Sequence, residues 1–468
     1  MPSPASAAPR AGPGVPLALA RWREQHYRAP RYELAFRLRA GAGTVSGTLR
    51  LAVTLPRGPV DLILDWRGGP VHGVRVNGRT ASHRHANQHL VISRRALKRG
   101  RNVLQLAFRA PVRAGGPLRR YRDAKDGAKY LYTLLVPADA SALFPCFDQP
   151  GLKGRFRLAL DLPEGWRAVA NAPALEERAG RARFALTPPI STYLFAFAAG
   201  PFEIVKQNGE SVRLFVRQSR LATARAAAPE LLRLNRTAMN RFARFCGHPF
   251  PFPKYDLVLI PDFHYGGMEH AGATFLREDC ILLRQPRSRA ERRRRALLVL
   301  HETAHQWMGN LVTMRWFDDL WLKEGFANFL TYSALEPLLP ECDGERAWAE
   351  LTALGRRASV KRGAAALHVP LANLAAARSV YTDLVYCTAP AVLRAAEREF
   401  GAANFRHAVR AFVRRHAWGA ADWHDLVHAL ERATGRDLRA WARKRILQPG
   451  ALAAHAPATR AKGIQSKA

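Results

Sequence analysis

The most constraining feature of the sequence is the stretch 300–329, which contains His301, Glu302, His305 and Glu324. Two histidines four positions apart project from the same face of a helix, so both imidazoles can reach one metal ion. Glu302 lies between them and faces the open coordination position. A catalytic zinc takes three protein ligands and keeps one position for water, and Glu324 is the natural candidate for the third ligand. The spacing therefore predicts a first helix, a loop, and a second helix that returns alongside the first.

The boundaries of these two helices can also be predicted. Ser288 and Glu291 have the spacing of a capping box, which would start the first helix. This helix is expected to end near Gly309. Asp318 and Asp319 are expected to cap the returning helix.

The residue set suits hydrolysis of a peptide or an ester. Zinc lowers the pKa of a bound water toward neutrality, so Glu302 can take the proton and later give it to the leaving amine. The alternative is a chance pentapeptide on an ordinary amphipathic helix. Glu324 at a suitable distance argues against that alternative.

Composition indicates a globular protein of two or three domains, with 468 residues and 48% hydrophobic residues. No run approaches the 18 or more apolar residues of a membrane span, and the N-terminus lacks a basic segment followed by an apolar core. We therefore expect a cytoplasmic protein without a membrane span. The five cysteines are scattered and contain no CxxC pair, which fits a reducing compartment.

The formal net charge of +36 could indicate nucleic acid, an anionic membrane surface or acidic substrates as partners. The excess is mostly arginine in an alanine-rich chain, which looks like a general composition bias. The densest basic run, 287–295, falls on the first turns of the zinc helix. It is predicted to be a solvated face, with a basic docking patch as the alternative, so no specific nucleic acid is expected.

The pattern along the chain predicts four segments. Residues 1–27 have no periodicity and are expected to be a flexible leader, and residues 451–468 a flexible tail. Alternating apolar residues over 28–204 predict short half-buried strands in a sandwich of antiparallel sheets. Residues 205–450 are expected to form the catalytic domain.

Three histidines, His83, His85 and His89, fall in one predicted hairpin turn of the β domain. They could be imagined as a metal cluster, but a polar hairpin tip is the preferred interpretation. Cys146 lies in the motif FPCFDQP and has no histidine nearby in sequence, so it is predicted to be a packed thiol and not a nucleophile.

HETAHQWMGNLVT, followed by LWLKEGFANFL, resembles the aminopeptidase N family of gluzincins, which also includes leukotriene hydrolase. FPCFDQP and its flanking strands are similar to that family's N-terminal domain. The resemblance implies an α+β multidomain fold, in which an N-terminal antiparallel β-sandwich-like domain is followed by a thermolysin-like, mainly α-helical zinc peptidase domain. It implies one zinc ion per chain, bound by His301, His305 and Glu324, with Glu302 as general base. The chain would be a short member without the C-terminal helical domain.

The resemblance also implies a substrate site. The family's Gly-x-Met-Glu-Asn strand, whose backbone pairs with the substrate, corresponds here to Gly266, Gly267, Met268, Glu269 and His270. By this resemblance Glu269 holds the free α-amine of the substrate, which implies an aminopeptidase acting on peptides. The sequence does not specify an oligomeric state.

A tyrosine that donates to the oxyanion is implied at Tyr386, with Tyr381 as the alternative. After Tyr386 the family's Lys-Gly-Ala is replaced by Thr388, Ala389 and Pro390, a change that could alter how this tyrosine is held.

The sequence departs from the family pattern at the amine site as well. His270 replaces an asparagine, and Leu134 and Val136, which follow Thr133, stand where polar substrate contacts are usual. The leading prediction is a zinc-dependent aminopeptidase. The alternatives are an atypical zinc hydrolase with altered substrate recognition, and a non-catalytic basic binding protein on the same fold.

Overall fold

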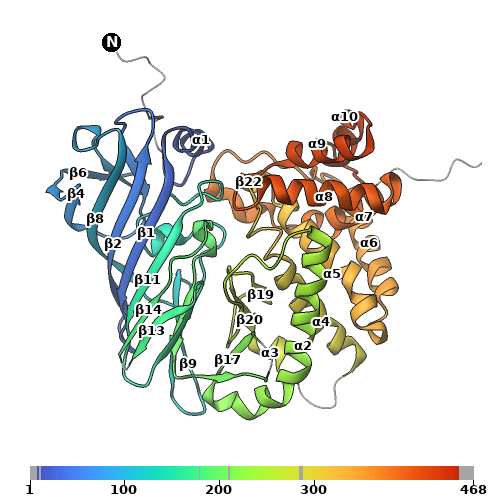
Figure 1. The fold of residues 1–468 in the computed structure, drawn as a ribbon, viewed down its shortest axis with the longest axis horizontal. Helices are drawn as coiled ribbons and strands as arrows, with labels where there is room; N and C mark the ends of the chain where they lie inside the picture. The colour runs from blue at the N-terminus through green and yellow to red at the C-terminus, as the bar shows by residue number, and fades with distance from the viewer. Residues whose placement is uncertain (1–7, 10–11, 179, 209–210, 284–287, 453–468) are drawn as a thin grey trace, which may run out of the picture.

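The structure is a computed structural model, and it describes residues 8–9, 12–178, 180–208, 211–283 and 288–452. A β-rich N-terminal domain lies beside a mainly helical domain that contains a five-stranded sheet and a two-stranded sheet, β21 (Thr313–Met314) with β22 (Ala420–Ala421) (Figure 1). The order of the two domains and their secondary structure confirm the predicted fold class.

The N-terminal domain contains three sheets. Several of its strands alternate buried and exposed residues, as expected for strands with one face toward a core. In β1 (Arg28–Arg37), for example, Tyr32, Leu34 and Phe36 are buried and their neighbours are more exposed. An eight-stranded sheet has the order β13-β14-β11-β1-β2-β8-β4-β5. Its other strands are β2 (Thr44–Leu55), β4 (His72–Val76), β5 (Arg79–Thr80), β8 (Gly100–Pro111), β11 (Arg155–Asp161), β13 (Ala174–Arg178) and β14 (Arg181–Phe184).

Two smaller sheets complete this domain. One has the order β12-β15-β10-β9 and the other β3-β7-β6. Their strands are β3 (Leu62–Asp65), β6 (His83–Ala86), β7 (His89–Ile92), β9 (Leu118–Arg122), β10 (Lys129–Thr133), β12 (Arg167–Ala170) and β15 (Phe197–Gly200). Most pairs are antiparallel, as predicted, but β1 and β11 pair in parallel.

The second domain begins with a five-stranded mixed sheet in the order β16-β17-β18-β20-β19. Its strands are β16 (Phe202–Val205), β17 (Arg213–Arg217), β18 (Asp256–Ile260), β19 (Gly267–Met268) and β20 (Ala273–Arg277). Since β16 already belongs to this sheet, the change of domain falls between β15 and β16, just before the predicted boundary at residue 204.

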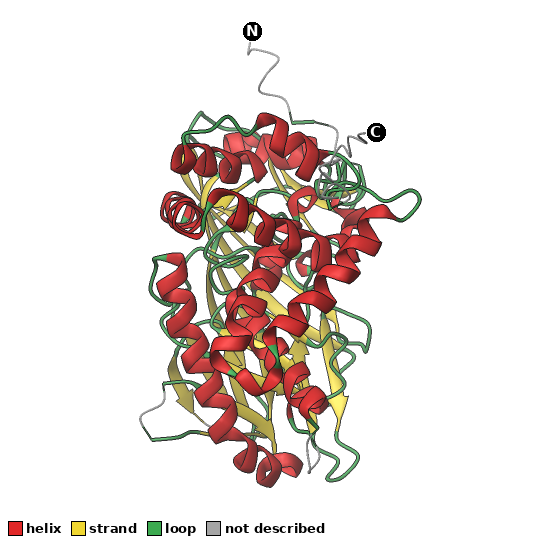
Figure 2. Ribbon diagram, turned by 90° about the vertical axis from the view of Figure 1, so that its right-hand side faces the viewer, coloured by secondary structure: helices red, strands yellow, loops and turns green. Residues whose placement is uncertain are grey.

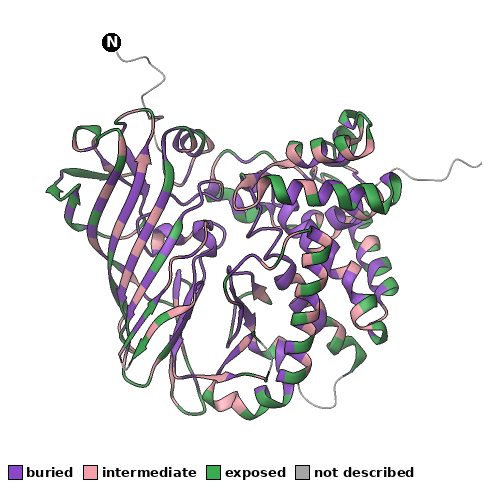
Figure 3. Ribbon diagram, viewed as in Figure 1, coloured by how far each residue is buried: buried purple, intermediate pink, exposed green. Residues whose placement is uncertain are grey.

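Helices pack on this sheet and on one another, and they lie in front of the strands in Figure 2. The main helices are α2 (Leu221–Cys246), α4 (Arg289–Ala304), α5 (Trp321–Leu338), α6 (Gly344–Val360), α7 (Ala389–Phe400), α8 (Ala402–His416) and α9 (Trp423–Thr434). Shorter pieces are α3 (Glu278–Ile281) and α10 (Arg439–Ala442). The contact faces of the strands and of the central helices are largely buried (Figure 3). None of the described helices is long and apolar enough to span a membrane.

The predicted flexible leader is wrong over its second half. Residues 17–26 form helix α1 (Leu17–His26), in which Leu19 and Arg23 are fully buried. The guanidinium of Arg23 donates to both carboxylate oxygens of Asp65, at 2.7 and 2.8 Å. This segment also reaches the second domain, since the backbone N of Leu17 donates to the carbonyl of Ala372. Residues 1–7 and 10–11 of the leader lie outside the described residues.

Two smaller predictions, for the hairpin histidines and for the basic run, also need correction. His83 and His85 are exposed on the β6–β7 hairpin, but His89 is buried, with Nδ1 2.9 Å from an oxygen of Asp65. In the basic run, Arg295 is buried and ion-pairs with Glu230, so only part of the run is a solvated face.

The predicted tail is wrong at its first residue. Ala451 is buried, and its carbonyl accepts a hydrogen bond from Arg445. Residues 453–468 lie outside the described residues.

One lysine of the N-terminal domain contacts the second domain directly. Lys153 is buried, and its Nζ donates to the backbone carbonyls of Asn310 and Leu311, at 2.8 and 2.9 Å. Burial lowers the pKa of Lys153 to about 7. The two carbonyls belong to the loop that follows α4, so the N-terminal domain holds that loop directly.

Candidate metal centre and active site

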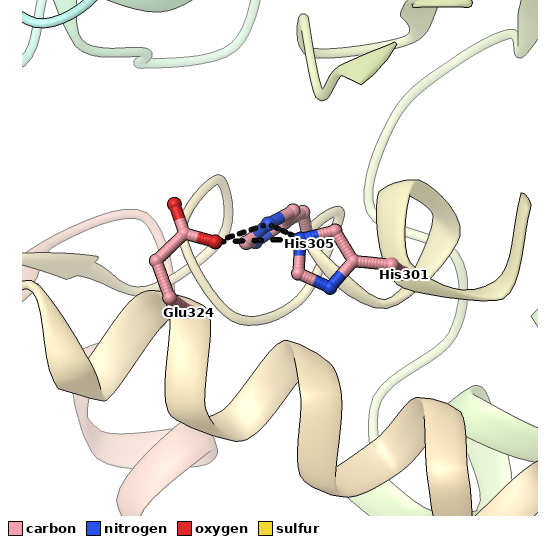
Figure 4. A group of neighbouring side chains, drawn as sticks. All are labelled: His301, His305 and Glu324. Atoms are coloured by element: carbon pink, nitrogen blue, oxygen red, sulfur yellow. Dashed lines mark hydrogen bonds and ion pairs between the residues drawn. The ribbon is translucent and has the colours of Figure 1, made fainter. Parts of the chain in front are cut away.

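The predicted metal ligands converge on one point between α4 and α5 (Figure 4). The Nε2 atoms of His301 and His305 lie 2.9 Å apart, and each lies 3.3 Å from Oε2 of Glu324. Ligand atoms bound to a tetrahedral zinc at about 2.0–2.2 Å are separated by roughly 3.3 Å. The three side chains therefore have the spacing of a zinc ligand set.

The second nitrogen of each histidine is held by a hydrogen bond that orients the ring. Nδ1 of His301 donates to Oδ1 of Asn328 at 2.7 Å, and Nδ1 of His305 donates to the carbonyl of Met308 at 2.9 Å. In the neutral imidazole, which is the form that binds a metal, both Nε2 atoms are then lone-pair acceptors that face the carboxylate of Glu324. A buried cluster made only of acceptors is unfavourable unless a cation joins it, so the residues fit a bound metal ion.

The helix boundaries explain how these ligands are positioned. The capping box of Ser288 and Glu291 begins α4, as predicted. This helix ends at Ala304, earlier than expected, and the chain then turns tightly to Gly309, whose φ is +125°. Asp318 and Asp319 do not cap α5, since its N-cap is Leu320. Asp319 instead accepts hydrogen bonds from His368 and from the backbone N of Trp423.

Glu302 lies beside the ligand set and is buried. Burial raises the pKa of its carboxyl to about 8, which is suitable for a group that takes and returns a proton near neutral pH. Its Oε2 has no hydrogen-bond partner among the described residues. A Cβ added at Gly267 would lie 2.5 Å from the other oxygen, so a glycine is required where β19 passes Glu302.

The strand β19 lies at the edge of the five-stranded sheet and pairs only with β20 within the described chain. A free strand edge of this kind can pair with an extended peptide. Glu269 follows β19 directly and is buried. Its backbone carbonyl accepts hydrogen bonds from the side-chain amides of Gln306 and Asn310. Glu269, Glu302 and His305 also lie close together. One carboxylate oxygen of each glutamate and one ring nitrogen of His305 lie within 4.8 Å of one another.

Lys323 contacts both carboxylates of this region. Its Nζ lies 2.6 Å from Oε1 of Glu269 and 3.0 Å from Oε1 of Glu324. Burial raises the pKa of Glu269, but the nearby charges of Lys323 and His305 outweigh burial and lower it. Burial likewise lowers the pKa of Lys323, and the two carboxylates outweigh burial and raise it well above its usual range. The ion pair is therefore charged on both sides.

His270 is fully buried beside Glu269, and its ring packs edge-on against Phe275 at 4.5 Å. Burial lowers the pKa of His270 to about 3, so the ring is neutral. Neither ring nitrogen has a hydrogen-bond partner among the described residues.

The two candidate tyrosines differ in their surroundings. Tyr386 lies in a π-helical turn, η9 (Leu384–Thr388), with its ring centroid 6.4 Å from that of His301. Its backbone carbonyl accepts a hydrogen bond from Nδ2 of Asn328 at 2.7 Å. π-helical turns occur frequently at functional sites. Tyr381 faces Lys323 instead, whose Nζ lies 5.9 Å from its ring centroid.

Two of the residues that replace the usual Lys-Gly-Ala fix the end of η9, one through a hydrogen bond and one through a close contact. Thr388 donates a hydrogen bond from its hydroxyl to the carbonyl of Gly355. A Cβ added at Gly325 would lie 2.7 Å from that of Ala389, so α5 and α7 approach closely here. Leu134 and Val136 are buried in the apolar core. Cys146 is a buried free thiol, as predicted, and burial raises its pKa well above the usual range.

Sequence reasoning did not single out Asn328, Lys323 or Lys153. Asn328 follows Glu324 by one helical turn, so its position on the ligand face of α5 could have been read from the spacing. Lys323 is next to a predicted ligand, but its partner Glu269 comes from a distant part of the chain. Nothing in the sequence indicates that Lys153 contacts the loop after α4.

Comparison with known proteins agrees with this architecture. The Peptidase M1 N-terminal domain matches residues 29–194, and the Peptidase family M1 domain matches residues 232–444. A β-rich domain joined to a helical domain with this ligand set defines a metallopeptidase-type architecture. The chain belongs to peptidase family M1.

Named relatives are similar over most of this chain. Aminopeptidase N of Streptomyces lividans is 30% identical over 86% of this chain and 48% of its own length. Aminopeptidase M1 of Arabidopsis thaliana is 31% identical over 72% of this chain and 39% of its own length. Leucyl aminopeptidase of Saccharolobus solfataricus is 29% identical over 74% of this chain and 45% of its own length. The chain thus spans about half or less of the length of these relatives.

Proposed function

We propose that the chain is a zinc-dependent aminopeptidase that removes N-terminal residues from peptides. The observation that carries the proposal is the convergence of His301, His305 and Glu324 on one point, with the buried carboxylate of Glu302 beside it. The names of the relatives support the same activity. We propose one zinc ion per chain at this centre.

Zinc at this centre would supply a Lewis acid and a water of lowered pKa. Glu302 takes the proton of the attacking water and returns it to the leaving amine. The hydroxyl of Tyr386 donates to the oxyanion that forms at the scissile carbonyl, and one such donor contributes about 2.7–4 kcal/mol to the transition state.

Binding of the substrate is assigned to the residues around β19. The peptide backbone pairs with the free edge at Gly266, Gly267 and Met268, as in other strand additions. The carboxylate of Glu269 faces the α-ammonium group, so it favours peptides with a free N-terminus. His270, neutral and buried, is proposed to shape this end of the site without carrying charge.

The test is hydrolysis of matched free and N-acetylated peptides by the purified chain, together with metal analysis. We expect one zinc per chain and cleavage of the free peptides only. Glu302→Gln should abolish cleavage and keep the zinc, and Tyr386→Phe should lower kcat by about 10²–10³-fold. Equal cleavage of both peptide sets, or full activity of Glu302→Gln, would refute the proposal.

We also propose a reducing compartment such as the cytoplasm. All five cysteines are free, and Cys146, Cys246 and Cys342 are buried. Protein purified without reductant should show five reactive thiols after unfolding, and fewer would contradict this proposal.

A further inference from the structure

A lysine ammonium lies at the proposed amine-binding carboxylate. Nζ of Lys323 is 2.6 Å from Oε1 of Glu269, and the lysine side chain is 2% exposed. The substrate's α-ammonium would bind the same carboxylate. Two ammonium groups on one carboxylate lie about 5 Å or less apart, where like charges repel strongly inside a protein.

The surroundings of Lys323 keep this ammonium in place. Besides the two carboxylates, the rings of Tyr193 and Tyr381 lie 5.2 and 5.9 Å from Nζ, within the range of cation–π attraction. A Cβ added at Gly309 would lie 3.0 Å from Cγ of Lys323, so the glycine makes room for the lysine stem.

The charge of Lys323 determines the net charge of the proposed amine subsite. In the proposed function Glu302 transfers the proton and Glu324 binds the metal. Glu269 is then the carboxylate that remains to bind the amine. Leu134 and Val136, at positions where polar contacts are usual in the resembling family, contribute no charge. One carboxylate paired with one internal ammonium gives an amine subsite of net charge near zero.

We propose that Lys323 is a specificity-determining residue, an internal competitor that weakens the binding of the substrate's α-ammonium at Glu269 while bracing the metal ligand Glu324. This inference rests on the proposed function. The same ammonium performs both tasks, because it lies 3.0 Å from the Glu324 oxygen that is not directed at the histidines. Loss of such a second contact to a ligand typically weakens metal affinity 10–100-fold.

The experiment measures binding of L-leucinamide and N-acetyl-L-leucinamide by titration calorimetry. All proteins are zinc-saturated and carry Glu302→Gln to prevent turnover. We expect Lys323→Met, which removes the charge and keeps the aliphatic stem, to lower the Kd of L-leucinamide at least tenfold, or about 1.4 kcal/mol. The Kd of the acetylated probe should not change. An unchanged or higher Kd for L-leucinamide would overturn the proposal.

A double-mutant cycle tests whether the effect passes through Glu269. In a Glu269→Gln background, Lys323→Met should no longer improve binding, and a retained improvement would overturn the proposed competition. Zinc affinity, measured by chelator competition without any ligand, should fall 10–100-fold in Lys323→Met. An unchanged zinc affinity would overturn the bracing role.

Lys254→Met is the matched control, since Lys254 is a largely buried lysine 2.6 Å from the carboxylate of Asp256, outside this site. It should leave both affinities unchanged. If Lys323→Met does not fold, Lys323→Gln removes the same charge and takes its place. If the Glu302→Gln protein with native Lys323 binds both probes equally, the proposed amine recognition fails. If it prefers L-leucinamide but Lys323→Met brings no gain, only the inference fails.

Discussion

Replacement of Arg23 by methionine should destabilise the N-terminal domain strongly. Arg23 makes a two-point contact with Asp65, and both side chains are buried. Removing one partner of a buried ion pair costs about 3–5 kcal/mol, because the other charge is left buried and uncompensated. Asp65 retains contacts with Nδ1 of His89 and the backbone N of Asp148, so a cost near the lower limit, about 3 kcal/mol, is expected.

Thermal unfolding measures this effect. For a domain of 150–250 residues each kcal/mol corresponds to about 2–4 °C, so Arg23→Met should lower Tm by about 6–12 °C. Arg21 lies on the exposed side of the same helix and provides the control. Arg21→Met should change stability by no more than about 0.5 kcal/mol.

A second variant separates the ion pair from a simple loss of packing. Asp65→Asn removes the stranded charge, so it should restore part of the stability lost in Arg23→Met. If the two substitutions instead add, or if Arg23→Met is no worse than Arg21→Met, the reasoning about the buried pair is refuted.

Three further predictions concern other contacts. Asn328→Ala should weaken zinc binding about 10–100-fold in chelator competition, because the ring of a ligand histidine loses its acceptor; unchanged affinity would contradict this. Gly267→Ala should displace Glu302 and reduce kcat on the order of 10²-fold with zinc retained, and normal turnover would show that the added methyl is accommodated. The hydrogen bond to Asp319 raises the pKa of His368, so its stabilising contribution is full below pH about 6.5 and is lost as pH rises through the folded pKa. The Tm difference between the native chain and His368→Gln should accordingly shrink from pH 6 to pH 8, and a constant difference would exclude this linkage.

The features of the site whose geometry agrees with the sequence-based expectation depend on local spacing. His301 and His305 share a helical face whatever the rest of the fold does, and the capping box of Ser288 and Glu291 is complete within four residues. Glu324 could be predicted to lie near the two histidines because it falls on the next helix, and the structure places it there. Alternation of apolar residues predicted the strands for the same reason.

The errors arise where a distant partner decides the outcome. The segment of α1 shows no apolar periodicity and so resembles a leader, but Asp65 from β3 supplies the counter-charge that lets Arg23 be buried. Asp319 has the right type and place for a helix cap, yet Trp423 and His368 compete for it successfully. The ion pair of Lys323 with Glu269 joins helix α5 to the residue that follows strand β19. No local sequence pattern shows that these two segments lie close together.

The contact of Lys153 with the carbonyls of Asn310 and Leu311 has a consequence for exchanging domains between relatives. The loop that it holds also binds the carbonyl of Glu269 through the side chains of Asn310 and Gln306. A hybrid with the N-terminal domain of a relative would keep every proposed catalytic residue but lose the hydrogen bonds from Lys153 to this loop. The loop would be held as before only if the relative has a cationic side chain at the same place. Exchange of the N-terminal domain is therefore expected to preserve activity only between relatives that share this contact.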